Sequence, residues 1–308
     1  MTAADEPVLI LAFNRPEHLR ALIDRLRQVR PSKVYLAVDG ARPGRPAEAA
    51  AVLACQELLS AIDWPCETST LFQEANLGCG RGVSTAITWF FEHEERGIIL
   101  EDDILPDVSF FPFCAELLDR YQDDARVFAI SGCNYVPPEA ISSPGAYRFS
   151  RVPHIWGWAT WRRSWAKHRL DIAGWRRELT PRDLWKSAGR SPAGFAYWTS
   201  TFELLGRKQV DTWDGQLVFA SMVAGGVTAT SNVNLVENLG FGTAATHTVR
   251  KPDYLRKVES IAVPTEPVAV EVDEVADAWT RRHHFEATLV GFTQQGTRYL
   301  RRRLRRQH

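Results

Sequence analysis

Three consecutive acids, Glu101, Asp102 and Asp103, follow the continuous apolar run 98–100. Such a run predicts a strand that is covered on both faces, so the acids stand at its carboxyl end. Asp39 follows an earlier strand-like run, 33–38, in the same way. Ligands of parallel α/β sheets bind outside the carboxyl ends of the strands, which makes these four carboxylates candidates for one site.

The chemistry that fits clustered carboxylates is cation binding. Like charges packed together resist ionisation unless a cation or hydrogen bonds compensate. Mg²⁺ or Mn²⁺ would do so, because these hard ions often take one or two carboxylates and complete their coordination with substrate phosphates. The alternative is that the acids cap a helix beginning near Pro106 and Asp107, where the helix dipole favours negative charge. The motif alone leaves these interpretations about even, and its position after a strand favours a site.

The segments that must position these acids alternate between two periods. Strand-like runs predict strands at 8–13, 33–38, 67–72, 98–100 and 127–132, and helical spacing predicts intervening helices near 14–30, 48–62, 83–94 and 107–121. This alternation indicates an α/β fold with a mainly parallel central sheet flanked by helices. After about residue 135 the pattern changes to a turn-rich and tryptophan-rich segment, a helix-like stretch at 211–226, an extended strap at 263–272 and a C-terminal helix from 273.

Composition excludes several classes of protein. The 308 residues carry 37 Lys and Arg against 37 Asp and Glu, so no bulk charge points to nucleic acid. Five dispersed cysteines indicate free thiols in a reducing compartment rather than disulfides or a zinc site. No segment has the pattern of a signal peptide or a spanning helix, which predicts a cytoplasmic protein.

Four motifs in order, "PVLILAFNRPEHL", "YLAVDGAR", "NLGCGRG" and "IILEDDILPD", resemble those of glycosyltransferases with the GT-A (nucleotide-diphospho-sugar transferase) fold. The chain is similar to the N-acetylglucosaminyltransferase I type and to bacterial sugar-transferase-like proteins that carry "WGWATW" segments. The similarity covers roughly residues 7–250. Each motif alone is weak, and their combination is specific.

The resemblance implies roles for residues near the donor nucleotide. Phe13, Asn14 and Arg15 correspond to the first nucleotide-binding loop. Asp39 would face the base, and Arg81 would approach the diphosphate or the ribose.

The resemblance also implies a metal site and a base. The "EDD" triplet would be the variant of the DxD motif, with Asp103 on the metal, Glu101 as its support and Asp102 as support or a ribose contact. "TWDGQ" makes Asp214 the candidate base, although it could equally cap the helix that follows. His247, in the late loop, would lie near the diphosphate or the metal, and a plain hydrogen-bonding role is the alternative.

A run of tryptophans suggests a sugar pocket. Trp156 and Trp158, with His154 beside them, are candidates to line an acceptor or donor-sugar pocket, since an aromatic face stacks on a sugar. Trp161 and Trp165 are expected in the core. Trp158, Trp161 and Trp165 also share the spacing of one helical face.

These observations predict a metal-dependent, inverting glycosyltransferase that uses Mn²⁺ or Mg²⁺ and a nucleoside-diphosphate sugar, with UDP implied by the resemblance. The acceptor would be a glycan, a lipid-linked molecule or a small molecule. We expect residues 1–135 to form the nucleotide-binding half and 136–250 the acceptor-binding half of one domain, followed by a strap and basic helix at 251–308. The alternatives are a sugar-nucleotide nucleotidyltransferase, which the lack of glycine in "AFNRPEHL" disfavours, and a non-catalytic binding protein.

The terminal "RYLRRRLRRQH" concentrates six arginines in eleven residues. Its composition favours a soluble helix end, and weak peripheral contact with the inner face of an anionic membrane is the alternative.

Overall fold

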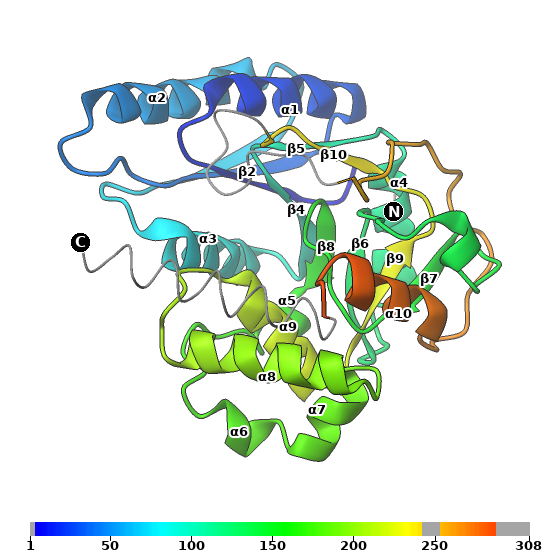
Figure 1. Cartoon of the computed structure of the whole chain (residues 1–308). Helices are drawn as coiled ribbons and strands as arrows, with labels where there is room; N and C mark the ends of the chain where they lie inside the picture. The colour runs from blue at the N-terminus through cyan, green and yellow to red at the C-terminus, as the bar shows by residue number, and fades with distance from the viewer. Residues whose placement is uncertain (1–3, 242–252, 288–308) are drawn as a thin grey trace.

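A computed structural model describes residues 4–241 and 253–287, and the elements below lie within these ranges (Figure 1). One sheet of eight strands has the order β3-β2-β1-β4-β8-β6-β9-β7. Its strands, in chain order, are β1 (Val8–Ala12), β2 (Lys33–Val38), β3 (Glu67–Phe72), β4 (Arg96–Glu101), β6 (Val127–Ser131), β7 (Tyr147–Ser150), β8 (Trp158–Trp161) and β9 (Val227–Ser231).

The sheet is mainly parallel, as the sequence predicted. Strands β3, β2, β1 and β4 run parallel to one another, β8 is antiparallel to both β4 and β6, and β7 is antiparallel to β9. A separate antiparallel ribbon pairs β5 (Ile104–Pro106) with β10 (Val236–Asn238). Strands of both predicted halves therefore share one sheet, and the boundary at residue 135 stays a prediction.

Helices cover both faces of the sheet (Figure 1). The long ones are α1 (Pro16–Val29), α2 (Pro46–Glu57), α3 (Gly78–His93), α4 (Phe110–Arg120), α8 (Pro192–Gly206), α9 (Asp214–Val223) and α10 (Glu274–His283). Shorter ones are η1 (Leu58–Ala61), η2 (Pro138–Ala140), α5 (Arg162–Trp165), α6 (Trp175–Glu178) and α7 (Pro181–Ser187).

Alternation along the strands divides the core. Val8 and Ile10 of β1 pack with the apolar faces of α1, α2 and α4, whereas Leu9 and Leu11 pack with α3 and α9. A third cluster joins α6, α7, α8 and α9 away from the sheet. The continuous apolar runs at 8–12 and 98–100 are thus explained, because these strands are covered on both faces.

Helix α1 shows how local signals set element boundaries. Pro16 stands at its first turn, and Leu19, Leu22, Ile23 and Leu26 form its buried stripe. Arg30 then adopts a left-handed conformation, with φ of 55°, and its N–H bonds the carbonyl of Leu26 at 2.7 Å. This ending returns the chain to β2.

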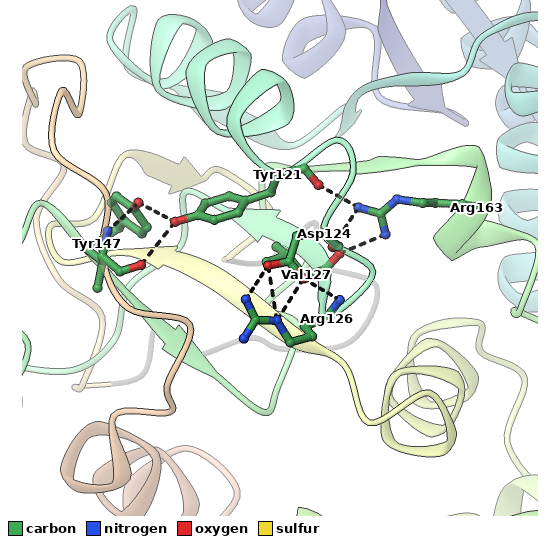
Figure 2. Close-up of polar contacts among 7 residues, drawn as sticks. Tyr121, Asp124, Arg126, Val127, Tyr147 and Arg163 are labelled. Carbon is green, nitrogen blue, oxygen red and sulfur yellow. Dashed lines mark hydrogen bonds and ion pairs between the residues drawn. The ribbon is translucent and has the colours of Figure 1, made fainter.

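Arg163 has a structural role next to β8 (Figure 2). Its guanidinium donates hydrogen bonds to the backbone carbonyls of Tyr121, Asp124 and Val127 at 2.9–3.2 Å. It also stacks over the ring of Trp161, 4.2 Å from the centroid. The arginine thereby adds a second hydrogen bond to the carbonyls of Tyr121 and Asp124, which also accept the backbone N–H groups of Asp124 and Val127.

The tryptophan segment differs from the predicted helical face. Trp158 to Trp161 form strand β8, and only Arg162–Trp165 are helical. Trp158 is 1% exposed, and its ring stacks on Trp213 at 5.7 Å between centroids. The strand inserts between β4 and β6, so its side chains are buried by sheet and helices together.

Replacing Trp158 should therefore cost much of the stability. We expect Trp158→Ala to lower the free energy of unfolding by about 3–5 kcal/mol, because it opens a cavity against Trp213. Chemical denaturation measures the effect. Trp185→Ala is the matched control, since Trp185 is 38% exposed and its loss should cost less than about 1 kcal/mol. Equal losses in the two variants would contradict the assigned core.

Candidate functional site

The strand order reverses between β1 and β4, and a cavity of about 680 Å³ opens beside this point. Such a reversal is where open α/β sheets bind ligands. The predicted residues that line it are Phe13, Asn14, Arg15, Asp39, Glu101, Asp102 and Asp103. The structure thus brings three sequence-distant loops to one cavity.

The acidic triplet lies between two strands and caps no helix. Glu101 ends β4, and β5 begins at Ile104. Helix α4 starts only at Phe110, after Asp107 accepts hydrogen bonds from the N–H and hydroxyl groups of Ser109 at 2.9 and 2.6 Å. The helix-cap interpretation of the triplet was wrong because the ribbon β5–β10 intervenes.

Backbone contacts fix the orientation of the two aspartates. The Oδ2 atom of Asp102 accepts a hydrogen bond from the N–H of Phe13 at 3.2 Å, which joins the triplet to the loop after β1. The carbonyl of Asp103 accepts one from Leu239 at 2.8 Å. Gly240 lies directly against the carboxylate of Asp103, so a larger residue there would force that side chain to move.

Arg15 supplies positive charge to the triplet. Its Nη1 atom lies 2.5 Å from Oδ2 of Asp103 and 3.5 Å from Oδ1 of Asp102. The arginine lies three residues beyond the end of β1, so the parallel pairing of β1 with β4 brings its loop to the triplet. One guanidinium faces three carboxyl groups, so ionisation of all three would leave an excess of negative charge.

The protonation of the acids reflects this excess. Burial and the nearby Asp103, Asp102 and Asp214 raise the pKa of Glu101 to about 8. Burial and Asp103 raise the pKa of Asp102 to about 7, against the opposing effect of Arg15. Such perturbed carboxyls in a cavity mark a functional site or a cation site.

The residues fit a divalent ion that shares its coordination with a ligand. Within the described ranges, no group of three or more His, Cys, Asp or Glu side chains is arranged to hold a metal by itself. Asp103 lines the cavity beside Glu101, and both offer the hard oxygens that Mg²⁺ and Mn²⁺ prefer. Phosphate oxygens of a bound ligand would supply the remaining positions.

Asp39 holds the loop that precedes α3. Its carboxylate accepts hydrogen bonds from the N–H groups of Gly40, Leu77 and Gly78 at 2.9–3.2 Å and from the amide of Asn76 at 3.0 Å. Burial nevertheless raises its pKa. These bonds occupy much of the hydrogen-bond accepting capacity of Asp39. The resemblance had assigned this carboxylate to contact with the nucleobase of the donor.

Asp211 is a residue of the cavity wall that sequence reasoning missed. Its carboxylate accepts hydrogen bonds from the N–H groups of Cys79 and Gly80 at 3.1 and 3.0 Å, at the start of α3. The segment "DTWDG" contains two acids near a tryptophan, a pattern that could have marked Asp211 as a second candidate beside Asp214. Only the fold brings Asp211 to the glycines of "GCGRG".

Asp214 is the first residue of α9. Its Oδ1 atom accepts hydrogen bonds from the hydroxyl of Thr212 and from the N–H of Gly215. It makes no N-cap bond, since Trp213 occupies the cap position. Its charge contributes to the raised pKa of Glu101 and, after partial desolvation by neighbouring parts of the chain, to the raised pKa of the Cys79 thiol. Asp214 therefore lies at the edge of the acidic cluster.

Five predicted residues that the structure describes are absent from the cavity wall, namely Arg81, Asp214, His154, Trp156 and Trp158. Arg81 is exposed on the first turns of α3, which begins at Gly78 rather than at Val83, and it is absent from the cavity wall. Trp158 is buried under α9 and cannot stack on a sugar, because its ring faces Trp213. The prediction that Trp158 lines a sugar pocket was wrong.

The other two predicted pocket residues belong to an aromatic cluster. His154 is 5% exposed, and its ring centroid lies 4.9 Å from that of Tyr135. Burial and the nearby His284 and Arg148 lower its pKa. Trp156 is half-buried and meets Tyr135 and Phe241 edge to face. A sugar-binding role for His154 and Trp156 stays a prediction.

His247 and the arginine-rich tail lie outside the described residues, as do most of the late loop and the predicted terminal helix beyond α10. Among the residues that the structure describes, no helix is both long and apolar enough to span a bilayer.

Comparison with known proteins reveals likeness of architecture only. No protein-family model and no curated protein matches the chain. UDP-glucose pyrophosphorylase complexed with UDP-glucose aligns with 9% identity and a TM-score of 0.35, over 76% of this chain and 91% of that one. The inositol-1-phosphate CTP transferase from T. maritima aligns with 10% identity and a TM-score of 0.34, over 75% of this chain and 86% of that one. HddC from Yersinia pseudotuberculosis aligns with 10% identity and a TM-score of 0.32, over 51% of this chain and 77% of that one. Similarities this low do not identify the reaction.

The raised pKa of Glu101 predicts a pH dependence of stability. Between pH 4.5 and about 8, the folded state holds a proton that the unfolded state has released, so the free energy of unfolding falls as pH rises. Glu101→Gln should therefore stabilise the metal-free protein by up to about 5 kcal/mol at pH 9, since each pKa unit corresponds to about 1.4 kcal/mol, and leave it unchanged at pH 4.

Thermal unfolding across this pH range measures the effect. Glu57→Gln, at an exposed position of α2, should follow the wild-type curve throughout. A gain from Glu101→Gln that is equal at both pH values would contradict the assigned titration.

Proposed function

We propose that this protein is a glycosyltransferase that moves a sugar from a nucleoside-diphosphate donor to an acceptor hydroxyl with the help of Mn²⁺ or Mg²⁺. The observation that carries the proposal is the position of Asp103 and Glu101. They face the cavity at the reversal of strand order, next to the loop after β1 and the start of α3. Sequence order of the four motifs supports the same assignment.

The cavity suits a nucleotide with its diphosphate toward the acids. Its lining includes the apolar side chains of Leu11, Ala37, Leu71 and Val83, which suit a base and ribose. Its polar end carries Arg15 and the triplet. Asp103 and Glu101 would hold the ion, which supplies charge stabilisation for the leaving diphosphate.

The chemical step would be a single displacement. The acceptor oxygen forms a bond to the anomeric carbon while the bond from that carbon to the diphosphate oxygen breaks, and the carbon inverts. Asp214 takes the proton of the acceptor hydroxyl. Arg15 is close enough to the triplet to turn from Asp103 to the negative charge that develops on the diphosphate.

A second reaction, nucleotidyl transfer, is favoured by one observation. Arg15 brings a cation to the loop directly after β1, where an enzyme that makes sugar nucleotides must bind a triphosphate. A sugar phosphate would then attack the α-phosphorus and pyrophosphate would leave. The same loop, "FNRPEHL", contains no glycine, so close contact of its backbone with a triphosphate is restricted.

Finer assignments follow from the resemblance. The donor would carry uridine, and the acceptor would be a glycan, a lipid-linked molecule or a small metabolite. The tail would allow weak contact with the inner face of a membrane during transfer to a lipid-linked acceptor.

Binding of a nucleoside diphosphate tests the site. UDP at about a hundred times its Kd should add roughly 2.7 kcal/mol of stability in the presence of Mn²⁺. Asp103→Asn should abolish the metal-dependent gain, because it removes a charged ligand beside the cavity. Differential scanning fluorimetry measures each variant against its own ligand-free protein. Asp107→Asn, which changes an acid of the next turn outside the cavity wall, should keep the gain. No shift by any nucleoside diphosphate in wild type would overturn the proposal.

Product analysis separates the two reactions. A glycosyltransferase releases UDP from a UDP-sugar, whereas a nucleotidyltransferase releases pyrophosphate from UTP and a sugar 1-phosphate. We expect UDP release, and expect Asp214→Asn to lower kcat by about 10²–10⁴ while UDP still binds, because the acceptor loses its base. Pyrophosphate release with undiminished turnover in Asp214→Asn would establish nucleotidyl transfer instead.

A further inference from the structure

The start of α3 is shaped around two carboxylates. A side chain at Gly78 would stand 2.7 Å from Oδ2 of Asp211, and one at Gly80 would stand 2.6 Å from its Oδ1. At Gly82 the nearest atom would be Oδ2 of Asp39, at 3.2 Å. The alternate glycines of "GCGRG" therefore allow carboxylates of this chain to lie against the helix.

Asp211 contacts this surface from the segment that joins α8 to α9. Asp211 accepts hydrogen bonds from the N–H groups of Cys79 and Gly80. The backbone of the next residue, Thr212, also lies against Gly80, because a side chain at Gly80 would be 3.0 Å from the carbonyl of Thr212. The negative charge also complements the positive end of the helix dipole. The segment is thus held along the helix by both side chain and backbone.

The same segment leads directly into the candidate base. Trp213 is 2% exposed and stacks on Trp158 of the sheet, and its carbonyl bonds Nε2 of His168 at 3.1 Å. Asp214 follows as the first residue of α9. Asp211 and Trp213 therefore anchor the approach to Asp214 on α3 and on the sheet, respectively.

We propose that Asp211 is a positioning residue that couples the donor-binding wall to the candidate base. Its carboxylate accepts hydrogen bonds from the N–H groups of Cys79 and Gly80 and so holds the start of α9 against the start of α3. Loss of this contact releases Gln209 to Asp211, which line the cavity, and lets Asp214 move relative to Glu101. The catalytic consequence rests on the proposed function, whereas the mechanical coupling does not.

Amide hydrogen exchange of the ligand-free protein tests the coupling. In Asp211→Ala, we expect peptides covering 77–84 and 212–220 both to exchange up to about tenfold faster. Gly80→Ala should do the same with Asp211 intact, because the added methyl group displaces the segment. Asp211→Asn, which keeps one accepting oxygen, should be intermediate.

Asp171→Asn is the matched control. Asp171 pairs with Lys208 of the same connecting segment at 2.9 Å, and both side chains are largely exposed. Its exchange should match wild type in both peptides. Faster exchange confined to 77–84 in Asp211→Ala would show that Asp211 only caps α3, and unchanged exchange in both peptides would remove the contact altogether. Either result overturns the proposal.

Turnover of the donor then tests the catalytic consequence. With UDP-sugar and Mn²⁺, Asp211→Ala should lower kcat at least tenfold with a smaller change in KM, and Asp211→Asn should recover part of the loss. Equal kcat in Asp211→Ala and wild type would overturn the positioning role even if exchange increases. If wild type neither binds UDP nor turns over a donor, the proposed function fails, and coupled exchange still supports the contact between α3 and α9.

Discussion

The structure depends on a concentration of negative charge at the carboxyl ends of its parallel strands. Glu101, Asp102 and Asp103 end one strand beside the loops after two others, and Arg15 brings one positive charge to them. Because burial weakens solvation, the pKa values of Glu101 and Asp102 rise to about 8 and 7. Protons, Arg15 and, under the proposed function, a divalent metal ion are therefore alternative ways to neutralise one cluster.

Carboxylates also organise the opposite wall of the cavity. Asp39 accepts hydrogen bonds from backbone N–H groups where the loop meets α3, and Asp211 accepts them from the first turn of α3. A helix start of this kind attracts anions, and here acids of the chain itself take its N–H groups. The wall is consequently built by side chains from two distant segments, one after β2 and one before α9.

How far the sequence predicts the fold depends on the element. Strands β2 and β3 have the predicted bounds, 33–38 and 67–72, because turn residues delimit them clearly. Helix α8 was not predicted, because its apolar residues are spread around the helix in the sequence, although only the face of Gly194, Trp198, Phe202 and Leu205 is buried. The ribbon β5–β10 is also beyond local reasoning, because each strand has three residues and the pairing spans more than a hundred positions. Trp158 looked like a ligand contact because buried and ligand-stacking tryptophans share the same local sequence.

By itself, the sequence determined the α/β class, the parallel sheet and the acids at the strand ends, because hydrophobic periodicity and strand-end position are local properties. Strand-end position also predicted that Asp39 and the triplet share one edge of the sheet, and the resemblance added Phe13 and Arg15 to them. Only the tertiary structure decided that Arg15 pairs with Asp103 and that Asp39 accepts hydrogen bonds from the loop before α3. It also decided that Asp211 packs against the start of α3. These contacts join residues 37 to 132 positions apart, and strand order and helix packing, rather than local propensity, select them.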